Sequence, residues 1–182
     1  MKVLLINGSP HANGCTFTAL SEVASQLGKH GIETRMFHIG NRPIQDCTAC
    51  GACAKTGRCV FTGDAVNECI DLLKASDGLV VGSPVYFAGP VGQITSFLDR
   101  MFFMKSGAYA HKPAAAVVSC RRGGASASFD RLNKYFTIAR MPVVSSQYWN
   151  SVHGNTPEEV RQDLEGMQTM RTLGENMAWM LA

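Results

Sequence analysis

Residues 2–16 read KVLLINGSPHANGCT, and this stretch decides the fold. Its first six residues, 2–7, form a short β-branched and apolar run that ends at a glycine, which predicts a strand buried on both faces. From Thr16 to Leu27, apolar residues recur at helical spacing and predict a helix. The chain therefore opens with a strand, a glycine-bounded loop and a helix, the unit from which parallel α/β sheets are built.

The loop between this strand and this helix has the composition of an anion-binding turn. Gly8 and Gly14 allow tight turns, and the hydroxyl groups of Ser9 and Thr16 stand where the loop meets the helix. Free N–H groups and the positive end of a helix favour a phosphate there. A P-loop is excluded because Cys15, not a lysine, precedes Thr16, and the fingerprint G-x-G-x-x-G is absent. The loop predicts a phosphate monoester that is bound without being transferred; the alternative is a plain β-to-α turn with a capping threonine.

Strands and helices alternate along the rest of the chain. The apolar patterns predict strands at residues 2–7, 32–39, 78–82, 114–119 and 142–146. Helices are predicted at residues 16–27, 65–75, 91–105, 125–138 and 157–180. This order predicts an α/β doubly wound sandwich, a five-stranded parallel sheet with helices on both faces. Ligands of such sheets bind beyond the carboxyl ends of the strands, so the loops after the strands are the candidate site.

Composition excludes several classes of protein. A chain of 182 residues with no linker or repeat predicts one domain, residues 1–182. The net charge of +3 is too small and too evenly spread for a nucleic-acid face or a polybasic membrane anchor. No run is continuously apolar over the ~20 residues that a bilayer requires. We therefore expect neither a nucleic-acid nor a membrane partner.

The chain contains seven cysteines, and Met1 leads straight into KVLLIN with no signal peptide. An odd number of cysteines without a signal peptide argues against a secreted disulfide scaffold. We expect a cytoplasmic protein whose thiols are ligands, reactants or core residues.

Three segments resemble the flavodoxin-like NADPH-dependent FMN reductases. They are VLLINGSPHANGCT at residues 3–16, SPVYFAGPVGQITSFLDR at 83–100 and KPAAAVVSCRRGG at 112–124. The resemblance continues through YWNSVHG, residues 148–154, a loop that we expect to pack and to shape the pocket. The first segment is similar to the family's phosphate loop, with His11 in a place that is usually arginine. The family implies a flavodoxin-like domain that binds FMN.

The resemblance also implies which residues contact FMN. They are Ser9, His11, Asn13, Gly14, Cys15 and Thr16 at the phosphate; Ser83, Pro84, Val85, Tyr86 and Phe87 at the isoalloxazine ring; and Cys120, Arg121, Arg122, Gly123 and Gly124 on the pyrimidine side. The residues alone leave alternatives open. The aromatic loop at residues 82–90 also suits a core contact or a dimer interface. The two arginines also suit a solvated turn or the phosphates of a nicotinamide nucleotide. Asp99 and Arg100 are interpreted as a structural or interface ion pair.

Four cysteines lie close together, spaced Cys47-x2-Cys50-x2-Cys53-x5-Cys59. A compact turn of this kind points thiolates at one centre and suits a [4Fe–4S] cluster. Zinc and free or redox-active thiols are the alternatives. The spacing resembles that of the iron–sulfur flavoproteins, a branch of the same family, in which electrons pass between FMN and a cluster. Cys69 is predicted to be a core residue, and Cys15 and Cys120 to lie near the ligand.

These observations predict an FMN-dependent NAD(P)H oxidoreductase. Hydride passes from NAD(P)H to N5 of the flavin and then to a second acceptor such as a free flavin, a quinone, a metal ion or a nitro- or azo-aromatic. No side chain is expected to act as a general acid or base. One alternative is an electron carrier that relays electrons between a [4Fe–4S] cluster, FMN and a ferredoxin-like partner, and another is a non-catalytic sensor. The family resemblance implies a homodimer or a dimer of dimers.

Overall fold

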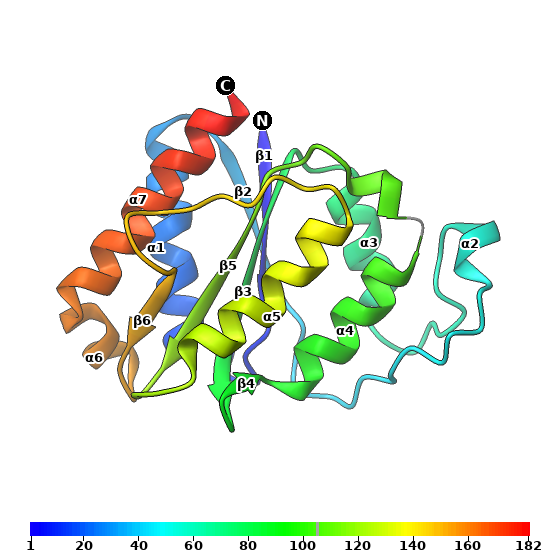
Figure 1. Cartoon of the computed structure of the whole chain (residues 1–182), viewed down its shortest axis with the longest axis horizontal. Coiled ribbons are helices and arrows are strands. Elements are labelled where there is room, and N and C mark those ends of the chain that lie inside the picture. The colour runs from blue at the N-terminus through cyan, green and yellow to red at the C-terminus, as the bar shows by residue number, and fades with distance from the viewer. Residues whose placement is uncertain (105) are drawn as a thin grey trace.

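The protein is built around one twisted sheet, seen nearly edge-on in Figure 1. The structure is a computed structural model that describes residues 1–104 and 106–182. Five parallel strands follow the order β2-β1-β3-β5-β6, and β4 pairs with β3 in antiparallel fashion. The strands are β1 (Lys2–Asn7), β2 (Glu33–His38), β3 (Gly78–Tyr86), β4 (Gly89–Pro90), β5 (Ala114–Cys120) and β6 (Ser151–His153). This is the strand order of flavodoxin-like sheets, so the predicted fold class is confirmed.

Helices cover both faces of the sheet. Figure 1 shows α1, α6 and α7 on one face and α3, α4 and α5 on the other. The helices are α1 (Cys15–Lys29), α2 (Cys53–Thr56), α3 (Val66–Lys74), α4 (Gly92–Phe103), α5 (Ala125–Ile138), α6 (Pro157–Gln162) and α7 (Leu164–Leu181), with a 3-10 turn at Ser106–Tyr109. The predicted helix at residues 91–105 ends at Lys105, which lies outside the described residues. Of the helices described, none combines the length and apolar character that crossing a membrane requires.

Alternation along β1 explains why both faces are covered. Leu4 and Ile6 enter the core beneath α3, α4 and α5, whereas Val3 and Leu5 enter the core beneath α1 and α7. All four side chains are completely buried. A strand that buries successive residues on opposite faces must lie in the middle of a sandwich, as the run KVLLIN predicted.

The predicted strand at residues 142–146 is wrong. This segment meets the sheet only at Ala114, whose N–H donates to the carbonyl of Pro142 and whose carbonyl accepts from the N–H of Val144. Because β5 begins at Ala114, the segment passes the end of its neighbour instead of running alongside it. The fifth parallel strand is β6, which comes from the segment predicted to be the loop at 148–154.

The predicted final helix is interrupted at Asp163. Its backbone leaves the helical conformation there, and its carboxylate accepts hydrogen bonds from the N–H groups of Gly166, at 3.0 Å, and His153, at 2.7 Å. An aspartate that bonds to nearby backbone N–H groups favours a cap over a helix interior. Asp163 therefore starts α7 and ties it to β6.

Candidate functional site

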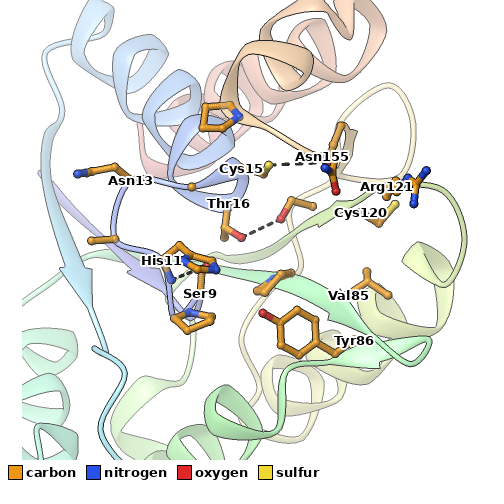
Figure 2. Close-up of a pocket in the computed structure, with 17 residues that line it drawn as sticks. Ser9, His11, Asn13, Cys15, Thr16, Val85, Tyr86, Cys120, Arg121 and Asn155 are labelled. Atoms are coloured by element: carbon orange, nitrogen blue, oxygen red, sulfur yellow. Dashed lines mark hydrogen bonds between the residues drawn. The ribbon is translucent and has the colours of Figure 1, made fainter.

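A large cavity lies at the carboxyl edge of the sheet. Its volume is about 740 Å³, and its walls come from the loop after β1, the end of β3, the end of β5 and the β6–α6 connection (Figure 2). The residues that line it are Ser9, Pro10, His11, Ala12, Asn13, Gly14, Cys15, Thr16, Pro84, Val85, Tyr86, Ser119, Cys120, Arg121, Gly154, Asn155 and Pro157. The cavity thus brings together residues from all three predicted loops.

Asn7 fixes the shape of the loop after β1. It is completely buried, its Oδ1 accepts from the N–H of Ser9 at 3.1 Å, and its Nδ2 donates to the carbonyl of Ala12 at 3.1 Å. The hydroxyl of Ser9 in turn accepts from the N–H of His11 at 3.1 Å. Sequence reasoning placed Asn7 at a strand end and missed this function. The sequence signal for this function was a residue with a polar amide side chain directly before Gly8, at the point where an apolar strand becomes a loop.

The start of α1 is arranged to receive an anion. Gly14 is its N-cap, and among the described residues no side chain caps the first turn and no acidic residue lies in it. The first helical hydrogen bond runs from the N–H of Thr18 to the carbonyl of Gly14, at 3.0 Å. The preceding N–H groups and the positive end of a 15-residue helix therefore face the cavity. Hydroxyl groups and helix N–H groups, both suited to a phosphate, therefore lie at the same end of the cavity.

Thr16 reaches across the cavity floor to β5. Its Oγ1 lies 2.8 Å from the Oγ of Ser119, and both residues are almost fully buried. Figure 2 draws this hydrogen bond as a dashed line that starts at the labelled Thr16. Ser119 was not among the predicted site residues, although its position at the start of the predicted loop at residues 119–124 was a usable signal.

The second predicted loop is largely a strand. β3 continues through Pro84, Val85 and Tyr86, whose side chains line the cavity, and then turns back into β4. The turn residues Phe87 and Ala88 have positive φ angles of 50° and 61°. Phe87 is fully exposed at the tip, outside the set of described residues that line the cavity.

Ser83 serves the hairpin rather than the cavity surface. It is completely buried, and its Oγ accepts from the N–H of Val91 at 3.1 Å and donates to the carbonyl of Pro84 at 2.8 Å. It thus fastens the start of α4 to the end of β3. Because the Ser83 hydroxyl both accepts and donates a hydrogen bond, it holds Pro84 and the adjoining residues of the hairpin in position.

The loop at residues 120–124 is divided between the cavity and the hairpin. Cys120 and Arg121 line the cavity, whereas Arg122 and Gly123 are exposed and, within the described set, lie outside its lining. Gly124 has a φ of +88°, and a Cβ on it would lie 2.6 Å from the Cα of Ala88. Gly124 therefore lets the start of α5 approach the hairpin closely.

Two cysteines of the cavity are neutral thiols. Burial raises the pKa of Cys15, with a further increase from Glu159 and Glu158, and burial followed by Asp163 raises the pKa of Cys120. Their sulfur atoms lie 3.8 Å and 3.6 Å from the carbonyl oxygens of Gly154 and Arg122. Both thiols therefore contribute size and weak hydrogen bonding, not charge, to the cavity wall.

The four clustered cysteines lie elsewhere, around α2, which projects from the α3–α4 side of the molecule in Figure 1. Cys47, Cys50, Cys53 and Cys59 all line a small, mostly apolar cavity of about 20 Å³. Burial, followed by the proximity of Cys47, raises the pKa of Cys53. All seven cysteines are free thiols.

The donor chemistry of this second cavity suits a soft metal, because thiolates are the ligands that such metals prefer. Within residues 1–104 and 106–182, however, no group of three or more Cys, His, Asp or Glu side chains is placed to hold a metal ion directly. Cys69 is not part of this group; it is completely buried in the core, as expected.

Asp99 and Arg100 do not pair with each other. Arg100 turns inward and pairs with Asp64, whereas Asp99 lies 3.5 Å from Arg131 and accepts a hydrogen bond from Tyr135 at 2.5 Å. The expected structural role holds for both residues, with different partners.

Comparison with known proteins assigns the chain to a family. The model of the NADPH-dependent FMN reductases matches residues 1–156. The chain belongs to the NADPH-dependent FMN reductase family. The expected enzyme class is thereby confirmed: this FMN reductase homologue is an NAD(P)H-dependent flavin oxidoreductase, and FMN and NADPH are the cofactor and co-substrate of its family.

Its relatives include an iron–sulfur flavoprotein of Methanocaldococcus jannaschii, which is 31% identical over 186 residues, 98% of this chain and 96% of the relative. The expected similarity to the iron–sulfur flavoprotein branch is therefore confirmed as well. Among solved structures, RosB superposes with a TM-score of 0.78 at 15% identity, over 100% of this chain and 79% of RosB. An archaeal flavodoxin superposes with a TM-score of 0.65 at 13% identity, over 100% of this chain and 99% of the flavodoxin. These two structures establish that the FMN reductase homologue has a flavodoxin-like fold.

Proposed function

We propose that residues 1–182 form a single FMN-binding domain that oxidises NAD(P)H in the cavity at the carboxyl edge of the sheet. The observation that carries this proposal is the juxtaposition of a helix N-terminus, a fixed loop and the buried Thr16–Ser119 hydroxyl pair on one side of a 740 Å³ cavity. Cofactor sites commonly have volumes of about 300–1,000 Å³, so this cavity is large enough for FMN.

The phosphate end of FMN belongs at the loop after β1. The N–H groups of the first turn of α1 and the hydroxyls of Ser9 and Thr16 are suitable donors, and His11 and Asn13 complete the rim. A Cβ on Gly14 would lie 3.1 Å from the Cβ of His11, so this position suits a residue without a side chain. These groups bind and orient a phosphate that is not transferred.

The ring end of FMN belongs between the hairpin and the loop after β5. Pro84, Val85 and Tyr86 offer apolar and aromatic surface, and Arg121 brings a positive charge to the opposite wall. When bound, FMN supplies hydride acceptance at N5 and transfer of electrons to a second, small-molecule acceptor such as a flavin or a quinone. The chain's own residues hold the ring and exclude water, and the positive charge of Arg121 favours an anionic pyrimidine edge.

We further propose that the protein acts as a homodimer or a dimer of dimers in the cytoplasm. Phe87 is fully exposed and Tyr86 is half exposed beside the cavity, and exposed aromatic surface of this kind suits cover by a second copy. The free state of all seven cysteines is in keeping with a reducing compartment.

Anaerobic purification followed by titration with NADH and NADPH tests the function. The expected result is a yellow protein with one FMN per chain whose flavin absorbance bleaches on addition of either nucleotide. A protein that remains colourless after incubation with FMN contradicts the cofactor, and a flavin that NAD(P)H fails to bleach contradicts the reaction.

A second function, electron relay between FMN and a [4Fe–4S] cluster with a ferredoxin-like partner, has its own support. Cys47, Cys50, Cys53 and Cys59 line one cavity, and relatives of similar length carry the name iron–sulfur flavoprotein. Among the described residues the four thiols are not placed as a metal-binding group, so cluster binding would bring the cysteines closer together. Assay of iron, zinc and acid-labile sulfide in the anaerobic protein decides between a cluster, zinc and free thiols.

A further inference from the structure

Among the described residues, Arg100 is the largest side chain that is almost completely buried, and it points toward the loop that carries the four clustered cysteines, residues 47–59, here called the cysteine loop. Its Nε–H donates to the Sγ of Cys59 at 3.2 Å. The two terminal nitrogens donate to both carboxylate oxygens of Asp64 and to the carbonyls of Gln45, at 3.2 Å, and Phe61, at 3.0 Å. All five N–H groups of the guanidinium are therefore in use, and every acceptor lies in or beside the cysteine loop.

A second buried side chain holds the backbone of the same cysteine. Asn67, on α3, is 7% exposed. Its Oδ1 accepts from the N–H of Cys59 at 2.9 Å, and its Nδ2 donates to the carbonyl of Cys59 at 2.9 Å and to that of Phe61 at 3.3 Å. Cys59 is thus fixed through its sulfur by α4 and through its backbone by α3.

The other three thiols of the loop are held differently. Cys50 is exposed, and within residues 1–104 and 106–182 the sulfur atoms of Cys47, Cys50 and Cys53 have no hydrogen-bond partner. Packing alone does not require this asymmetry. Burying a guanidinium and an amide is unfavourable unless both are hydrogen-bonded, and both of these groups are hydrogen-bonded to Cys59.

We propose that Arg100 and Asn67 are positioning residues that hold Cys59 as the fixed ligand of a soft, thiolate-bound metal centre, around which the more loosely held cysteines close. The proposal rests on the second function above. It adds that the positive charge of Arg100 compensates the negative charge that thiolates bring to the site, while Asp64 keeps the guanidinium in place.

Cobalt(II) titration of the metal-free, fully reduced, full-length protein tests this assignment. Thiolate ligation gives charge-transfer absorption that neither FMN binding nor simple folding produces. Removing an outer partner of a metal ligand lowers metal affinity about 10- to 100-fold, and we expect this loss for Arg100→Met/Asp64→Leu. The double variant leaves no buried charge unpaired.

The matched control is Asp99→Leu/Arg131→Met, which removes the neighbouring ion pair of α4 and α5 and leaves the cysteine loop intact. We expect it to bind cobalt like the unmodified protein. If the Arg100→Met/Asp64→Leu variant does not fold, Asn67→Ala replaces it as the test variant. We expect Asn67→Ala to weaken cobalt binding as well. Cys59→Ser should weaken cobalt binding more than Cys50→Ser.

Three results would overturn the proposal: no charge-transfer absorption in the unmodified protein, equal cobalt affinity in the Arg100 and Asp99 double variants, or equal losses in Cys59→Ser and Cys50→Ser. FMN affinity, measured on the same samples, tests the first proposed function separately. A protein that binds cobalt but not FMN contradicts that function and leaves the assignment of Arg100 standing.

Discussion

The hydroxyl groups of Thr16 and Ser119 lie 2.8 Å apart, although 103 positions separate the two residues in the chain. This contact joins the first turn of α1 to the second-last residue of β5 at the floor of the cavity. It exists because parallel strands bring all their carboxyl ends to one edge of a sheet.

Replacing Thr16 by valine should weaken FMN binding. The valine keeps the shape but removes the hydroxyl that we propose donates to the phosphate, and a hydrogen bond to a charged group contributes about 1.5–3 kcal/mol. Isothermal titration with FMN measures the loss. Thr169→Val is the matched control, since Thr169 is equally buried and bonds only within α7. Unchanged affinity in Thr16→Val would remove this residue from the phosphate site.

Replacing His11 by arginine should strengthen FMN binding by roughly 1 kcal/mol, because a guanidinium is permanently charged and binds phosphate through two donors. His11 lines the cavity at the phosphate loop. Comparing FMN with riboflavin, which lacks the phosphate, isolates the effect: only FMN should gain. His30→Arg, at the exposed far end of α1, should change neither affinity. A gain for riboflavin as well would place His11 at the ring instead.

Replacing Gly124 by alanine should destabilise the hairpin beside the cavity. The position has a φ of +88° and only 2.6 Å of space before the Cα of Ala88, whereas a Cβ on Gly123 would meet nothing within 4 Å. Backbone strain of this kind costs about 1–3 kcal/mol. Urea denaturation should show this loss in Gly124→Ala and little change in Gly123→Ala. Equal stability of the two variants would mean that the hairpin can shift freely.

Cys15 and Cys120 should resist alkylation by iodoacetamide near neutral pH. Burial raises the pKa of both thiols above the ordinary value of 9.0, so each remains protonated until the pH rises beyond that value. Mass spectrometry of the alkylated peptides, from neutral to alkaline pH, gives the profile of each site. Added FMN should slow both reactions further, because both cysteines line the cavity. Fast alkylation that FMN does not affect would place these thiols outside the binding site.

Much of the fold could be predicted because the central strands are apolar on both faces. The runs at β1, β3 and β5 are almost wholly buried, and their composition alone indicates this. β6 escaped prediction because it is only three residues long and half exposed at the sheet edge. The apolar segment at residues 142–146 resembled a strand, but it meets the sheet at the first residue of β5, and no local pattern records where a neighbouring strand begins.

The candidate site was predictable where its residues adjoin a strand end, as in Ser9 to Thr16. The site was not predictable where side chains contact residues that are far away in the sequence. The ion pair between Arg100 and Asp64 spans 36 positions, and Asn67 acts on Cys59 from another element. Which residues become partners in this way depends on how α3 and α4 pack against the rest of the chain. The spacing of residues along the sequence does not show that packing.

The tip of the β3–β4 hairpin is a position at which the amino-acid sequence can change without disturbing the core. Phe87 is fully exposed with a φ of 50°, a conformation that costs an ordinary L-residue about 1–2 kcal/mol and that asparagine or glycine would adopt more easily. Substitution of Phe87 therefore disturbs no core packing among the described residues. Retention of an aromatic residue at this position in relatives would indicate that the ring serves a contact outside its own chain.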